Sequence, residues 1–142
     1  MLILISDSFD KSLYKKLSKY GEVTDDKSKI NEAEVLLIRS KTKVTKEYID
    51  TSPKLKLVIR GGVGLDNVDL KYASEKGITV HNTAAASAIA VAECAFTLMI
   101  GITNHVARAD SSIRDGKWIK KELKRTELYK KTLGIIGLGR IG

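Results

Sequence analysis

Three glycines within four positions follow a short apolar run in the first half of the chain. Leu57-Val58-Ile59 indicates a buried strand, and Gly61 to Gly64 contains the three glycines just after it. Because glycine has no Cβ and reaches positive φ, the backbone there can turn sharply and present N–H groups to an anion. Asp66 or Asp69 can cap the helix that follows. A strand, a glycine loop and a helix start predict an anion-binding site, although a turn without a ligand would have the same pattern.

A second glycine motif ends the sequence. Gly137-Leu138-Gly139-Arg140-Ile141-Gly142 has the spacing G-x-G-x-x-G, and we expect an apolar strand at 132–136 directly before it. In dinucleotide-binding folds the first glycine allows a tight turn, the second admits the pyrophosphate, and the third packs the helix on the strand. The motif alone is weak, because its confirming helix and acidic residue would lie after residue 142.

The hydrophobic pattern predicts the scaffold that positions these loops. Residues 2–5, 22–24, 35–38, 57–59 and 78–80 are candidate strands, and expected helices lie at 11–20, 45–49 and 69–76. Residues 7–10 are expected to form the turn after the first run. The alternation of strands and helices predicts an α/β fold with a parallel, doubly wound sheet. Ligands of such sheets bind beyond the carboxyl ends of the strands, where Arg39-Ser40, Gly61 to Gly64 and His81 to Ser87 would lie.

The rest of the chain is predicted to be mainly helical. Residues 87–107 indicate one long helix whose small, apolar side chains suit burial between two layers or domains. Ser87, Glu93 and Thr97 interrupt its apolar run, so we expect a buried helix and no membrane span. Residues 109–118 are expected to continue as a broken helix, and 122–131 as a polar connection.

Composition limits the functional classes. The 142 residues suit about one domain, and the single cysteine excludes an internal disulfide framework. Without a recognisable secretion signal, the expected location is the cytoplasm. The net charge is +8, but the densest basic segment, 114–131, has only two aromatic residues, Trp118 and Tyr129, and no interleaved aromatic series. We therefore expect a solvated face or a small anionic ligand and no nucleic acid, membrane or metal partner.

Taken together, the motifs resemble those of the D-isomer-specific 2-hydroxyacid dehydrogenases. They occur in the order of that family and cover nearly the whole chain, which is far more specific than one glycine motif. The matching segments are Arg39-Ser40-x-Thr42-Lys43-Val44, Arg60 to Asp69, Asn82-Thr83, Val91-Ala92-Glu93, Asp115 to Trp118, Thr126-Glu127-Leu128 and Lys131 to Gly142.

The resemblance implies two domains with the active site in the cleft between them. Residues 1–100 would be the N-terminal part of a flavodoxin-like, parallel-sheet substrate-binding domain. Residues 101–142 would comprise the crossover helix and the beginning of a Rossmann NAD-binding domain. The family resemblance further implies a homodimer built through the cofactor domain.

Site residues also follow from the resemblance. The family's glycine loop binds the substrate carboxylate through backbone amides, which here belong to Gly62, Val63 and Gly64. Arg39 and Ser40 resemble the pair that binds the phosphate of a phosphorylated 2-hydroxy acid, and a guanidinium donates bidentately to phosphate. Cofactor-binding positions for NAD would be Val63, near the nicotinamide, and the pyrophosphate loop Gly137, Gly139, Arg140, Ile141 and Gly142.

The sequence departs from the family pattern in two respects. Asn82-Thr83-Ala84-Ala85-Ala86-Ser87 stands where the family often has Asn-Thr-Pro-Gly-x-Asn, which makes the choice of substrate less certain than the family. The family's catalytic arginine, glutamate and histidine are expected after residue 142, so no catalytic residue is expected within this chain. Glyoxylate, lactate or another 2-hydroxy acid remains an alternative substrate, NADP an alternative cofactor, and a non-enzymatic NAD-sensing protein an alternative class.

Overall fold

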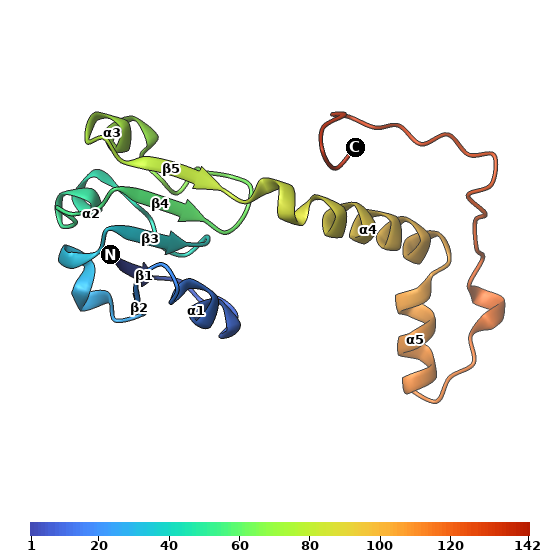
Figure 1. Cartoon of the computed structure of the whole chain (residues 1–142). Coiled ribbons are helices and arrows are strands. Elements are labelled where there is room, and N and C mark those ends of the chain that lie inside the picture. The colour runs from blue at the N-terminus through green and yellow to red at the C-terminus, as the bar shows by residue number, and fades with distance from the viewer. The chain divides into compact units, whose positions relative to one another are not determined.

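The computed structural model describes residues 1–142, which form two compact units, Met1–Ser87 and Ala88–Gly142. Figure 1 shows the order of the elements along the chain. Each unit is considered by itself below. The expected boundary near residue 100 separates functional domains, and it stays a prediction.

A five-stranded parallel sheet forms the first unit, in the order β2-β1-β3-β4-β5 (Figure 1). The chain moves outward from β1 to β2 and then returns past β1 to β3, which is the flavodoxin-like arrangement. The predicted α/β class and parallel sheet are therefore confirmed. The strands are β1 (Leu2–Ile5), β2 (Glu22–Thr24), β3 (Val35–Ile38), β4 (Leu57–Arg60) and β5 (Thr79–Asn82).

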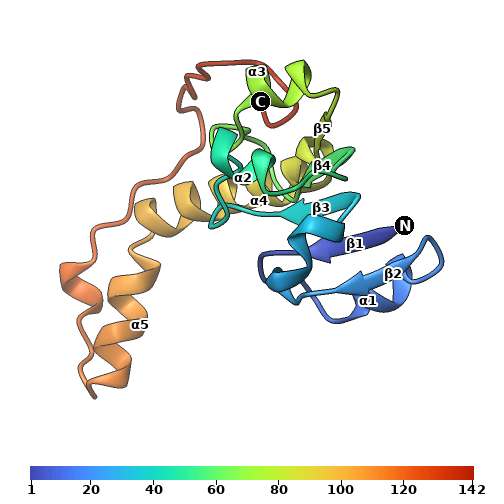
Figure 2. The same ribbon diagram turned by 90° about the vertical axis from the view of Figure 1, so that its left-hand side faces the viewer.

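The register of the sheet brings several loops to one edge. Ile5 is paired with Leu37, Ile38 with Arg60, and Arg60 with Asn82. Since all of these strands are parallel, β1, β3, β4 and β5 end at the same edge of the sheet (Figure 1), and Figure 2 shows the same unit turned by 90°. The loops that follow them are therefore neighbours at this carboxyl edge.

Short helices connect the strands, and polar side chains fix where two of them begin. The Thr45 hydroxyl accepts the Tyr48 N–H at 3.4 Å, and the Asp69 carboxylate accepts the Tyr72 N–H at 3.0 Å. Asp69 is thus the cap that follows the glycine loop, as one of the two predicted candidates. The helices are α1 (Ser12–Leu17), the 3₁₀ helix η1 (Lys27–Glu32), α2 (Lys46–Asp50) and α3 (Leu70–Glu75).

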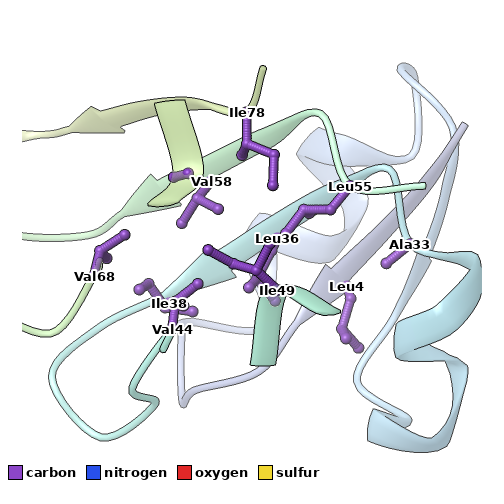
Figure 3. Close-up of a cluster of buried hydrophobic side chains, with 11 residues drawn as sticks. Leu4, Ala33, Leu36, Ile38, Val44, Ile49, Leu55, Val58, Val68 and Ile78 are labelled. Carbon is purple, nitrogen blue, oxygen red and sulfur yellow. The ribbon is translucent and has the colours of Figure 1, made fainter. Parts of the chain in front are cut away.

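Alternate strand residues supply the core on the two faces of the sheet. Four side chains point to one face of the sheet, are fully buried and pack with Ile49 of α2: Leu4, Leu36, Ile38 and Val58 (Figure 3). The opposite face buries a second cluster that packs against α1 and the preceding turn: Ile3, Ile5, Val35 and Leu37 with Phe9, Leu13, Tyr14 and Leu17. Burial on both faces explains the uninterrupted apolar runs of β1 and β3.

The chain after β5 is helical at first but differs from the prediction. One helix was expected over 87–107; instead α4 (Ala84–Thr103) and α5 (Val106–Arg114) are separate, followed by the 3₁₀ helix η2 (Lys120–Glu122). His105 lies between them with φ 53°, in the left-handed region that ends a right-handed helix. A turn at Asp115-Gly116 follows α5, with Gly116 at φ 70°.

Helix α4 is largely exposed, contrary to the expected burial. Of its 20 residues only Ala88 is buried, while Ile89, Phe96 and Ile102 are 75%, 59% and 72% exposed. Burial requires a partner surface, and these side chains have none in the described chain. By length and composition alone α4 could cross a membrane, with a mean hydropathy of 1.9, although a core helix of a soluble protein passes the same test.

The strand expected at 132–136 is absent. These residues have no regular structure, and Ile136 is fully exposed. A β-strand is stable only when it pairs with a neighbour, and no described strand pairs with this segment. The prediction of a strand before the second glycine motif is therefore wrong for this structure.

Candidate functional site

The turn after β3 lies beside the glycine loop after β4. The Gly61 N–H donates to the Ile38 carbonyl at 2.8 Å, which ties the two loops together at their start. A Cβ placed on Gly61 would lie 2.8 Å from Cε1 of Phe9 and 3.6 Å from Cγ of Arg39. The exposed residues Arg39 and Ser40 are thus brought next to the glycine loop, as the sheet topology predicts.

Two backbone amides of the glycine loop are free. The Gly62 N–H already donates to the Arg60 carbonyl at 2.9 Å and to the Thr83 hydroxyl at 3.0 Å. The N–H groups of Val63 and Gly64 have no partner in the chain, and both residues are exposed. An anion at this loop would therefore meet the Val63 and Gly64 amides, while Gly62 shapes the turn.

The end of β5 fixes the glycine loop in place. The Asn82 side-chain amide donates to the Val63 carbonyl at 2.7 Å, and the Thr83 N–H donates to the Gly62 carbonyl at 3.1 Å. With the Thr83 hydroxyl bond, these contacts orient the loop backbone from one side. Asn82-Thr83 is one of the segments that resemble the family, but no role was predicted for it. Hydrogen bonds between loops leave no local pattern in the sequence.

Gly62 needs glycine because of its positive φ, whereas a side chain on Gly64 would displace the exposed Asp66 carboxylate. Gly62 has φ 155°, and a Cβ there would collide with the guanidinium of Arg60. A Cβ on Gly64 would lie 2.6 Å from Oδ1 of Asp66. The Arg60 guanidinium lies beside Gly62, and its buried Nε has no hydrogen-bond partner, so a positive charge is next to the glycine loop.

Asp7, expected only as a turn residue, is a buried carboxylate at the same edge. It is 9% exposed and accepts hydrogen bonds from the Arg39 N–H at 2.6 Å and the Thr42 hydroxyl at 2.7 Å. Burial raises the pKa of Asp7, but the hydrogen bonds from Thr42, Arg39 and Lys41 outweigh it, so that the pKa lies below its ordinary value. Asp7 is therefore an anion at neutral pH.

The second glycine motif lies in the other unit and forms a tight turn. Gly137 has φ 90°, and a Cβ on Gly142 would lie 2.6 Å from the Gly137 carbonyl oxygen. Gly139 is open to solvent, with no atom near the place of a Cβ, so its backbone can be approached closely. The residue types fit a pyrophosphate loop, and the assignment of Gly137 to Gly142 to NAD stays a prediction. No three acidic, histidine or cysteine side chains are placed to hold a metal ion.

Comparison with known proteins identifies the family. A family model described as "D-isomer specific 2-hydroxyacid dehydrogenase, catalytic domain" matches residues 3–132. Since the match covers most of the chain, this chain belongs to the D-isomer-specific 2-hydroxyacid dehydrogenases, and the resemblance found in its motifs is confirmed.

Two proteins similar to this chain are named as different enzymes. D-3-phosphoglycerate dehydrogenase of Methanocaldococcus jannaschii is 45% identical over 148 residues, covering 99% of this chain and 28% of the relative. Hydroxypyruvate reductase of Thermotoga maritima is 53% identical over 113 residues, covering 80% and 37% respectively. The aligned parts of this chain therefore make up 28% and 37% of the lengths of these two relatives.

A solved structure supports the fold. D-Lactate dehydrogenase from Aquifex aeolicus, crystallised with NAD and lactic acid, aligns with a TM-score of 0.84 at 28% identity. The alignment covers 100% of this chain and 46% of the other. The α/β class with family-type architecture is thus shown.

Proposed function

We propose that this chain is the N-terminal part of an NAD-dependent oxidoreductase that converts D-3-phosphoglycerate into 3-phosphohydroxypyruvate, toward serine biosynthesis. The oxidoreductase class follows from the family. The phosphorylated substrate is favoured by the M. jannaschii relative, named D-3-phosphoglycerate dehydrogenase, whose similarity covers 99% of the chain. A cytoplasmic homodimer is part of the proposal.

The observation that carries the proposal is that Arg39 lies next to the glycine loop. Phosphoglycerate has a carboxylate at C1, a hydroxyl at C2 and a phosphate at C3. The free amides of Val63 and Gly64 would bind the carboxylate, and Arg39 with Ser40 would bind the phosphate. Two anionic ends held at neighbouring loops would fix C2 between them, which is the orientation that the reaction needs.

NAD, when bound, would supply the hydride acceptor for the C2–H bond. In this chain Gly137, Gly139, Arg140, Ile141 and Gly142 would hold its pyrophosphate, and Val63 would lie beside the nicotinamide. The base that takes the hydroxyl proton and the arginine that orients the keto acid are proposed to lie outside residues 1–142. No catalytic residue is assigned within this chain.

Hydroxypyruvate reduction is the second candidate, because the T. maritima relative of that name is 53% identical. The two candidates differ in whether the substrate carries a phosphate. A non-enzymatic NAD-sensing protein on the same scaffold would bind NAD or a partner without turnover.

The test is a kinetic comparison on the full-length protein, meaning this chain with the remainder of the family's length. NADH formation would be followed with D-3-phosphoglycerate and NAD, and NADH consumption with hydroxypyruvate, glyoxylate and pyruvate. A kcat/KM that is highest for D-3-phosphoglycerate with NAD supports the proposal. Preference for hydroxypyruvate favours the second candidate, and NAD binding without turnover of any acid favours the non-enzymatic class.

A further inference from the structure

The turn Arg39–Thr42 is held by side chains from two other loops, while the guanidinium of Arg39 forms only one long hydrogen bond within the chain. Asp7, just after β1, binds the N–H side of the turn. Its Oδ2 accepts the Arg39 N–H at 2.6 Å and the Thr42 N–H at 3.2 Å, and its Oδ1 accepts the Thr42 hydroxyl at 2.7 Å. The Ser6 and Thr42 hydroxyls lie 3.0 Å apart and complete this network.

Asn67, in the loop before α3, binds the carbonyl side of the same turn. Its side-chain amide donates to the Arg39 carbonyl at 2.8 Å and to the Thr42 carbonyl at 2.7 Å. Asn67 is itself fixed, because its carbonyl accepts the Val44 N–H at 2.8 Å. Each end of the turn is therefore held through both its N–H and its carbonyl.

The Arg39 guanidinium takes little part in these contacts. Arg39 forms no ion pair, although the Asp7 carboxylate binds its backbone N–H. Its one side-chain hydrogen bond is long, from Nη1 to the Ser8 carbonyl at 3.5 Å. A buried anion thus fixes the arginine backbone and leaves its charge available.

We propose that Asp7 and Asn67 are positioning residues that hold the Arg39–Thr42 turn in the conformation from which Arg39 and Ser40 bind the substrate phosphate. This inference rests on the proposed function, since it assumes that the turn binds phosphate. It adds that selectivity for a phosphorylated acid depends on two side chains that do not themselves touch the phosphate.

The test compares variants of the full-length protein. Asp7→Asn keeps the size of the side chain but removes the charge and one acceptor oxygen, and Asn67→Asp removes the donor that binds the two carbonyls. Each is expected to raise the KM for D-3-phosphoglycerate by about tenfold while changing the KM for D-lactate by less than about twofold. Asp26→Asn is the matched control: Asp26 accepts the Ser28 N–H at 3.0 Å in a different loop, and its loss should leave the ratio unchanged.

Two substitutions of Thr42 keep the inference testable if Asp7→Asn does not fold. Thr42→Ser retains the hydroxyl that donates to Asp7, whereas Thr42→Val removes it at nearly the same volume. Only Thr42→Val should lower the preference for the phosphorylated acid. Equal rises in KM for both acids in the Asp7, Asn67 and Thr42→Val variants would show a purely structural role and overturn the inference. If Arg39→Ala also leaves the preference intact, the proposed phosphate site itself fails, which separates the two claims.

Discussion

Replacement of Arg39 by alanine is the sharpest test of the phosphate site. The side chain contributes little to stability, because its one hydrogen bond in the chain is the 3.5 Å contact with the Ser8 carbonyl. We therefore expect Arg39→Ala to change the free energy of unfolding by less than about 0.5 kcal/mol, as for most exposed sites. A loss of activity would then arise from lost binding and not from unfolding.

The size of the kinetic effect can be worked from the same exposure. A charge-assisted hydrogen bond contributes about 1.5 to 3 kcal/mol, and a guanidinium can form two with one phosphate. Because Arg39 is exposed, water competes for both partners, and we take a total of about 2 to 3 kcal/mol. That corresponds to a fall of about 30- to 150-fold in kcat/KM for D-3-phosphoglycerate.

The assay measures kcat/KM for D-3-phosphoglycerate and D-lactate on the full-length protein, at fixed ionic strength and in a buffer without phosphate. Arg39→Lys is the matched variant, since it keeps the charge but loses the planar fork, and its effect should be intermediate. Equal losses on the two acids would refute the reasoning, because the arginine would then act on something other than the phosphate.

Three further predictions concern the glycine loop, the hydrophobic core and the stability of the fold at acid pH. Gly64→Val should raise the KM of phosphorylated and unphosphorylated acids alike by about tenfold, because the branched side chain would crowd the approach of a carboxylate to the free Val63 and Gly64 amides; unchanged kinetics would remove the carboxylate site. Leu36→Ala, at a side chain 0% exposed, should lower the free energy of unfolding in urea by about 2 to 5 kcal/mol, and a loss below 1 kcal/mol would contradict the observed packing. Since the pKa of Asp7 is lower in the folded chain than its ordinary 3.8, its stabilising effect is complete above that value and is lost as pH falls through the folded pKa. Urea titrations from about pH 2 to 6 should therefore show a weaker acid dependence in Asp7→Asn than in the parent, and identical curves would exclude this effect.

The sheet could be predicted from the sequence because its strands carry their own signal. Val35-Leu36-Leu37-Ile38 is an unbroken apolar run, and such runs are typical of parallel strands buried on both faces. Parallel order then determines which loops meet, so the proximity of Arg39 to the glycine loop followed from topology alone.

Features that depend on distant partners could not be predicted. Asp7 has the sequence context of a turn, and only the folded sheet shows that its carboxylate binds a loop 32 residues away. His105 ends α4 in a left-handed conformation that its neighbours in sequence do not signal. The expected strand at 132–136 was inferred from composition, whereas a strand also needs a paired neighbour.

The turn at Arg39 owes its shape to contacts of long sequence separation, and this has a consequence for how the site forms. Asp7 lies 35 residues before Thr42, and Asn67 lies 25 residues after it. Loop closure over such distances is entropically costly until the strands have assembled, so we expect the turn to acquire its conformation late in folding. The Arg39 and Thr42 amides should accordingly resist hydrogen exchange until the sheet opens as a whole, although they belong to a surface loop.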